Sequence, residues 1–135
     1  MSLKVLKFGG TSLADAEHFR QVANIVKSDP ERRYVVASAP GKRFNSDVKI
    51  TDMLYNCYEL SINEESVDEV FASICDRYNS IISELELDLD LTEAYAKIRL
   101  SLVHKSGRDY IASRGEYLNA MILAKYLGFD FIDAK

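Results

Sequence analysis

The stretch LKVLKFGGTSLADAEHFRQ, residues 3–21, decides the first part of the fold. Its opening run, residues 3–7, alternates like a short strand and stops at Gly9-Gly10. A helix is expected from there to about Ser28, because apolar residues recur on one helical face. These residues are Leu13, Ala16, Phe19, Ala23 and Val26. A turn alone does not require the lysine, Lys7, that stands at the strand's end, whereas a phosphate site would account for it.

A second strand follows this helix. RYVVAS, residues 33–38, is rich in β-branched and aromatic side chains, and Pro30 disfavours helix at Asp29 just before it. A strand, a helix and a strand in about 35 residues make a βαβ unit, which predicts a parallel sheet. The fold class is therefore α/β with a mainly parallel sheet.

The remainder of the chain is mostly helical. A polar loop is expected over residues 39–49, which contain Pro-Gly. Hydrophobic periodicity then predicts helices over residues 51–60, 64–85, 92–104 and 107–127, the last closed by Gly128. FDFIDA, residues 129–134, reads as a third strand. Because sheets usually have more than three strands, the chain is either a small α/β domain or the front half of a larger one.

Composition narrows the class of protein. The net charge of -4 argues against a nucleic-acid partner, which needs a basic face. No run approaches ~18 apolar residues, so no membrane span is expected. The N-terminal apolar stretch is too short, and too rich in lysine, for a signal peptide. Cys57 and Cys75 lack CxxC spacing, so we expect reduced thiols in or near the core of a cytoplasmic protein.

KFGGTS, residues 7–12, contains the parts of a phosphate site. Ligands of parallel sheets bind beyond the carboxyl ends of the strands, where Lys7 and the glycines lie. Gly9 and Gly10 let backbone N–H groups approach an anion, and the helix that follows turns its positive end toward it. Thr11 and Ser12 add hydroxyl groups. The alternative is a Gly-Gly turn beside a lysine that only reaches to solvent, since the stretch matches neither GxxxxGK[ST] nor GxGxxG.

VVASAPGKR, residues 35–43, places small residues at the end of the second strand. Parallel strand ends are neighbours, so this loop and the first are expected to face one crevice, with Ser38 and Gly41 among its residues. Arg43 and Lys49 are interpreted as solvated loop charges. Thr51 is either the cap of the next helix or a hydroxyl group that binds a ligand.

SRGEYLNA, residues 113–120, is the third stretch. Gly115 lies inside a good helix, where glycine costs ~1 kcal/mol relative to alanine, so another backbone or a ligand is expected to approach it closely. Glu116 either pairs with a neighbouring cation on the surface or holds the ammonium group of a substrate.

Together the three stretches resemble the amino-acid kinase family and, within it, the aspartokinases. KFGGTS is similar to the opening signature of aspartokinases. VVASAPGK, followed by KITD, is similar to their second glycine-containing loop and the threonine after it. SRGEYLNAMILAKYLG is similar to their third block. The resemblance runs over all 135 residues. It implies the family's three-layer α/β fold, present only as its N-terminal portion. The nucleotide-binding half and the C-terminal ACT domains are then not among residues 1–135.

The resemblance implies a reaction in which ATP phosphorylates the side-chain carboxylate of L-aspartate, the first step toward lysine, threonine and methionine. Lys7 would contact the transferring phosphoryl group, and the glycine loop would bind phosphates. Ser38 would line the aspartate site, Thr51 would hydrogen-bond the aspartate, and Glu116 would bind its α-ammonium. The adjacent Arg114 has no assigned role.

The same resemblance implies cofactors and partners. Mg²⁺ would be held mainly by the nucleotide, with no metal ligand in this segment. The partners would be L-aspartate, ATP, the remainder of the aspartokinase chain and, in the intact enzyme, further copies of itself. The segment alone is expected to be inactive. Two alternatives stay open: a kinase of the same family for glutamate, acetylglutamate, carbamate or a nucleotide, and a non-catalytic module that binds phosphate or a partner chain.

Overall fold

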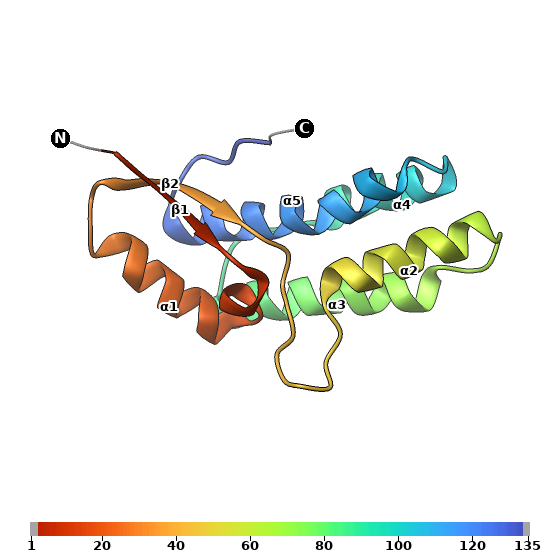
Figure 1. The fold of residues 1–135 in the computed structure, drawn as a ribbon, viewed down its shortest axis with the longest axis horizontal. Coiled ribbons are helices and arrows are strands. Elements are labelled where there is room, and N and C mark those ends of the chain that lie inside the picture. The colour runs from red at the N-terminus through yellow and green to blue at the C-terminus, as the bar shows by residue number, and fades with distance from the viewer. Residues whose placement is uncertain (1–2, 134–135) are drawn as a thin grey trace.

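The computed structural model describes residues 3–133 and places two strands against one side of a helical body (Figure 1). The elements in chain order are β1 (Lys4–Phe8), a 3₁₀ helix η1 (Gly10–Leu13), α1 (Ala16–Lys27), β2 (Arg32–Ala37), α2 (Ile50–Ile62), α3 (Asp68–Glu84), α4 (Thr92–Val103) and α5 (Arg108–Leu127). The predicted βαβ unit and the α/β class are confirmed.

The two strands pair in parallel, with Leu6 opposite Val35 and Lys7 opposite Val36. Inward and outward residues alternate from Val5 to Phe8 and from Tyr34 to Ala37, as a sheet covered on one face requires, and a register shift precedes Val5 and Tyr34. The inward side chains pack against the core, to which α1 and α5 contribute, and they are Leu6, Phe8, Val35 and Ala37. The sheet therefore has a helix-covered face and an open face.

The first helix begins later than the periodicity predicts. Leu13 belongs to η1, and α1 starts at Ala16 because the Asp15 carboxylate accepts the N–H of His18 at 3.0 Å. An aspartate in this position satisfies an N–H group that a helix end would otherwise leave unpaired. Thr11 and Ser12 consequently lie in the 3₁₀ turn, and the Ser12 N–H donates to the Gly9 carbonyl at 3.1 Å.

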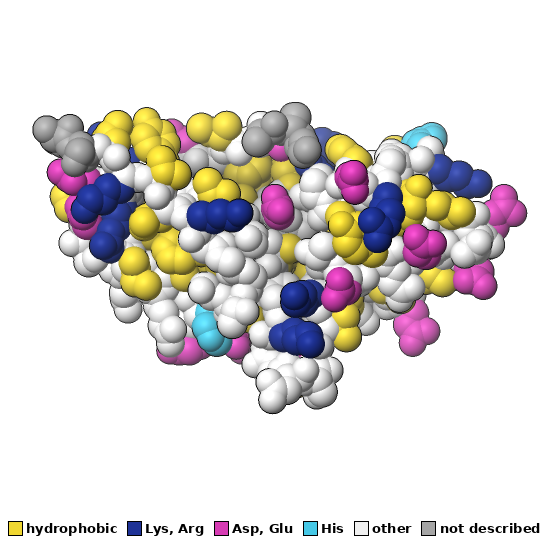
Figure 2. Space-filling model, in the orientation of Figure 1, with side chains coloured by type: hydrophobic (Ala, Val, Ile, Leu, Met, Phe, Trp, Pro, Cys, Tyr) yellow, Lys and Arg dark blue, Asp and Glu magenta, His cyan; other side chains and the backbone are white. Residues whose placement is uncertain are grey.

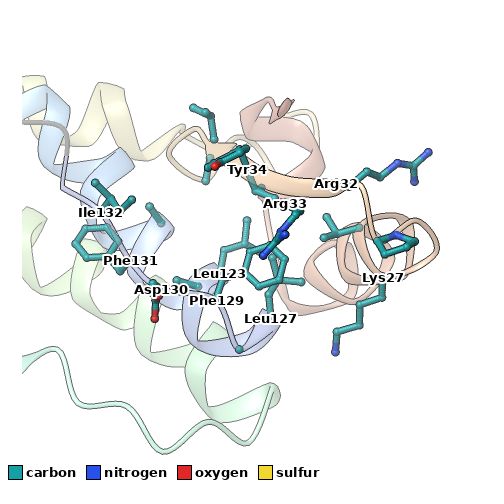
Figure 3. A pocket seen from close by; sticks show the side chains of 18 of the residues that line it. Lys27, Arg32, Arg33, Tyr34, Leu123, Leu127, Phe129, Asp130, Phe131 and Ile132 are labelled. Carbon is teal, nitrogen blue, oxygen red and sulfur yellow. The ribbon is translucent and has the colours of Figure 1, made fainter. Parts of the chain in front are cut away.

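The predicted third strand is wrong within the described residues. Residues 129–133 form no strand, Ala134 lies outside the described residues, and the sheet consists of β1 and β2. A groove of about 700 Å³ separates residues 129–132 from β2, so their backbones do not pair. Leu123 and Leu127 of α5 line this groove together with Tyr34 of β2 and Phe131 (Figure 3).

The helical body agrees more closely with the sequence. α3 starts at Asp68 rather than Glu64, because Glu64 has a φ of 58°, which a continuous helix cannot contain. Gly128 closes α5 in the left-handed conformation, as predicted. Cys57 is buried, Cys75 is half-buried, and both are free. Burial raises the pKa of each thiol to about 11, so both are protonated at neutral pH.

The open face of the sheet is apolar. Val5, Tyr34 and Val36 are 67%, 52% and 48% exposed. Figure 2 shows hydrophobic side chains gathered at the upper left of the molecule, where Figure 1 places the strands. Among the described residues, no helix is long and apolar enough to cross a membrane.

Candidate functional site

The two loops at the carboxyl ends of β1 and β2 meet backbone to backbone. The Gly41 N–H donates to the Gly10 carbonyl at 2.9 Å. A Cβ on Gly10 would lie 2.8 Å from the Ala39 carbonyl oxygen, and one on Gly41 would lie 2.7 Å from the Gly10 carbonyl carbon. Real Cβ atoms do not approach backbone so closely, so both positions require glycine. The expectation that these loops are neighbours is confirmed, and they pack directly against each other at Gly10 and Gly41.

Gly115 extends this contact to α2 and α5. A Cβ there would lie 2.9 Å from the Ala39 Cβ, 3.1 Å from Leu54 Cδ1 and 3.3 Å from Ile50 Cγ2. The glycine inside α5 therefore admits the second loop and the start of α2, as its position in a helix predicted, although side chains rather than a backbone approach it. We call Gly10, Gly41 and Gly115 the glycine junction.

Arg77 of α3 forms hydrogen bonds to the segments around the junction. Its guanidinium donates to the carbonyl oxygens of Val48 at 2.9 Å, Ala14 at 3.0 Å and Gly41 at 2.8 Å. The side chain is 6% exposed, and burial lowers its pKa from the usual arginine value. One buried cation of α3 thus binds three separate segments: the turn after η1, the second loop and the residues just before α2.

The second loop is also held by its own ion pair. Arg43 donates to Asp47 through Nε at 2.6 Å and Nη2 at 3.0 Å. Hydrogen bonds from Arg43 hold the pKa of Asp47 well below its usual range, with a contribution from Arg77 at 3.9 Å. Arg43, interpreted from the sequence as a solvated charge, is indeed exposed, but it organises the loop as well.

The predicted phosphate residues lie at one edge of the junction. Lys7 is exposed on the open face of the sheet, and the strand continues one residue beyond it to Phe8. Gly9 is exposed, and a Cβ there would meet nothing within 4 Å. Thr11 and Ser12 are exposed in η1. An exposed lysine, open space at a glycine and two hydroxyl groups fit a phosphate group.

The predicted acceptor residues border the junction in the sequence. Ser38, Thr51 and Glu116 are the chain neighbours of Ala39, Ile50 and Gly115, and a Cβ on Gly115 would lie within 3.3 Å of the Ala39 and Ile50 side chains. Ser38 and Thr51 are half-buried, and Glu116 is exposed. Within residues 3–133, no ion pair joins Glu116 to a cation. The structure therefore does not show the surface ion pair that the sequence offered as one interpretation of Glu116.

Thr51 is not a helix cap. The N-cap position of α2 is Lys49, and the helix starts at Ile50, whose N–H donates to the Pro40 carbonyl at 3.1 Å. This backbone bond satisfies a group that a capping side chain would otherwise bind. The interpretation of Thr51 as a cap is therefore wrong, and its hydroxyl group lies in the first turn of α2 without a capping bond.

Sequence reasoning missed three residues that support the site. They are Arg77, Tyr78 and Asn119. The Tyr78 hydroxyl donates to the Gly115 carbonyl at 2.8 Å, and burial raises its pKa well above the usual tyrosine value, so it remains a neutral donor. The Asn119 amide donates to the Ser38 carbonyl at 2.7 Å. The available signal was a polar side chain at a position that helical periodicity assigns to the buried face.

The structure also gives Arg114 a role that the sequence left open. Its guanidinium lies 4.7 Å from the centre of the Tyr110 ring and 4.5 Å from that of Tyr117. The side chain is buried and packs between aromatic groups of its own helix.

Among the described residues, no group of three or more His, Cys, Asp or Glu side chains gathers as a metal centre would require.

Comparison with known families gives this arrangement its context. The pattern of the amino acid kinase family matches residues 2–134. The chain belongs to the amino acid kinase family. Aspartokinase 3 of Bacillus subtilis is 36% identical over 139 residues, covering 98% of this chain and 31% of its own length.

Two solved structures agree with the fold. Clostridium acetobutylicum aspartate kinase superposes with a TM-score of 0.92 at 50% identity, over 96% of this chain and 30% of that one. Escherichia coli aspartokinase III, solved with aspartate and ADP, superposes with a TM-score of 0.75 at 25% identity, over 94% of this chain and 29% of its own. The chain thus spans less than a third of the length of the relatives it matches, and it has the parallel α/β arrangement of aspartate kinases.

Proposed function

We propose that the protein containing this chain transfers the γ-phosphoryl group of ATP to the side-chain carboxylate of L-aspartate, giving 4-phospho-L-aspartate. The observation that carries the proposal is the glycine junction, which joins the loop after Lys7, the loop after Ser38, the start of α2 and the middle of α5. The similarity to aspartokinases supports aspartate as the acceptor. The product would lead toward lysine, threonine and methionine in the cytoplasm.

The proposed chemistry needs charge and positioning more than proton transfer. An aspartate carboxylate is already ionised near neutral pH, so it attacks without a general base. The difficulty is that one anion approaches another, and positive charge on the phosphoryl oxygens reduces it. Lys7 supplies that charge, and the loop of Gly9 and Gly10 with Thr11 and Ser12 binds the phosphates. Mg²⁺, held mainly by the nucleotide, would neutralise further phosphate charge when bound.

The acceptor is held by three groups of complementary chemistry. Glu116 is an exposed carboxylate, which suits the α-ammonium group of an amino acid. Thr51 offers a hydroxyl group to the aspartate, and Ser38 lines the site. Because the chain spans about 31% of the Bacillus relative, we propose that the nucleotide site is completed outside these residues and that the chain alone has no turnover. We propose that the intact enzyme is a homo-oligomer.

The test is the trapping of the acyl phosphate. The complete gene product is incubated with ATP, Mg²⁺, L-aspartate and hydroxylamine, and aspartyl hydroxamate is expected. Lys7→Met should lower the rate by roughly 100-fold or more, because it removes a charge aimed at the transition state. Lys4→Met is the matched control on the same strand. Lys4 pairs with Asp29 at 2.6 Å, so its loss should leave the rate unchanged.

Two results would contradict the proposal. If aspartate is inert and glutamate, acetylglutamate, carbamate or a nucleotide is phosphorylated, the acceptor is wrong although the family stands. If Lys7→Met remains as active as the Lys4→Met control, Lys7 does not have the role assigned to it.

A further inference from the structure

Asn119 of α5 makes a buried hydrogen bond to the end of β2. The residue is 0% exposed, and its Nδ2 donates to the Ser38 carbonyl oxygen at 2.7 Å. The two residues are 81 positions apart in the chain, so the bond joins two separate elements. Ser38 is also fixed from the other side, because its own N–H donates to the Phe8 carbonyl at 3.1 Å.

The bond lies one helical turn from the Gly115 contact. Residues four apart share a face of a helix, so Gly115 and Asn119 point the same way. Gly115 approaches Ala39, and Asn119 binds Ser38, the preceding residue of the same segment. Two contacts on consecutive residues fix both the distance and the rotation of α5 relative to the end of β2. Glu116 lies on α5 between the two contact points.

The Asn119 amide is only partly satisfied in its buried position. Its Oδ1 is buried and has no hydrogen-bond donor among the described residues. A buried amide that satisfies only one of its two polar atoms loses solvation that the single bond offsets only in part. An aliphatic side chain would avoid that cost at Oδ1, but it would leave the Ser38 carbonyl without this donor. The retained amide therefore fits a residue whose value lies in where it holds Ser38.

We propose that Asn119 is a positioning residue of the acceptor site, which sets Ser38 in register with Glu116. This inference rests on the proposed function for the identity of the acceptor. Asn119 acts through the Ser38 backbone and does not touch the acceptor itself. It should therefore affect how well the acceptor binds, and leave the binding of ATP unchanged.

The test compares two variants of the complete gene product. Asn119→Leu removes the bond and keeps the number and branching of the side-chain heavy atoms. Ser61→Ala is the matched control, because the Ser61 hydroxyl donates to the Leu102 carbonyl at 2.6 Å and so also joins two helices, away from the junction. For Asn119→Leu, KM for aspartate should rise roughly tenfold or more while KM for ATP stays within about twofold. Ser61→Ala should change neither. Asn119→Ser, with a smaller side chain that is one bond shorter, is made in case the leucine variant does not fold, and its KM for aspartate should also rise.

Hydrogen exchange separates this inference from the proposed function. In Asn119→Leu, or in Asn119→Ser if the leucine variant does not fold, the amides of residues 36–41 should exchange faster than in the wild type, and in Ser61→Ala they should not. If wild type does not phosphorylate aspartate, the proposed function fails, and Asn119 is judged by this exchange and by KM for the acceptor that is used. The inference is overturned if acceptor KM is unchanged, if KM for ATP rises equally, if Ser61→Ala behaves alike, or if exchange over residues 36–41 does not change.

Discussion

The carboxyl ends of β1 and β2 differ sharply from the open face of the same sheet. At the strand ends, backbone touches backbone at Gly10 and Gly41, and Arg77 binds three carbonyl groups. On the open face, Val5 and Val36 remain about half exposed or more. The strands are shared by both regions, so the difference lies in the loops and helices around them. It indicates that the packing at the strand ends is completed by the described residues, whereas the other face of the sheet lacks a covering layer among them.

The largest expected effect comes from removing the buried cation of the strand-end region. Arg77→Met deletes three hydrogen bonds and leaves the Ala14 and Gly41 carbonyl groups without that donor. Unpaired buried polar groups cost ~1–3 kcal/mol each, so the free energy of unfolding should fall by about 3–5 kcal/mol. Arg99→Met is the control, because Arg99 forms an exposed pair with Asp68 and should cost less than about 1 kcal/mol. Urea unfolding followed by circular dichroism measures both. Equal losses in the two variants would mean that Arg77 is no more than a surface charge.

An intermediate effect is expected at the glycine junction. Gly10→Ala places a Cβ 2.8 Å from the Ala39 carbonyl oxygen, so the two loops must separate, at a cost of about 1–3 kcal/mol in the free energy of unfolding. Gly9→Ala is its matched neighbour, with nothing within 4 Å of the new Cβ, and it should be nearly neutral. Thermal unfolding of the two variants should therefore give clearly different midpoints. A Gly10→Ala variant as stable as Gly9→Ala would show that the loops are not closely packed.

The sequence predicted the strand-end region better than the sheet as a whole. Small residues at the ends of two strands, and Gly115 inside a helix, each signalled close approach, because glycine is costly where nothing requires it. Arg77 and Asn119 gave a weaker signal, a polar side chain on the helix face that periodicity assigns to the core. Arg77 binds the Gly41 carbonyl, 36 residues away, and Asn119 binds the Ser38 carbonyl, 81 residues away. Local periodicity does not report contacts between residues so far apart in the sequence.

The third strand was predicted wrongly for a related reason. FDFIDA has the alternation of a strand, but a strand also needs an edge to pair with. The structure puts a groove between residues 129–132 and β2 instead. Sequence pattern thus indicated which residues favour extended backbone, and left the pairing undetermined.

The smallest expected effect belongs to the open face, and neighbouring valines of β2 measure it. Val36 is 48% exposed, whereas Val35 packs against the core from the other face of the strand. Val36→Thr should change the free energy of unfolding by no more than about 0.5 kcal/mol. Val35→Thr should cost about 1 kcal/mol or more, because it places a hydroxyl group against apolar side chains. Since both variants keep a β-branched residue in the strand, strand propensity is nearly constant and the difference reports burial alone. Equal losses in urea unfolding would show that both faces of β2 are covered in solution, by a second copy of the chain or by residues 129–133, and sedimentation at several concentrations would distinguish these two.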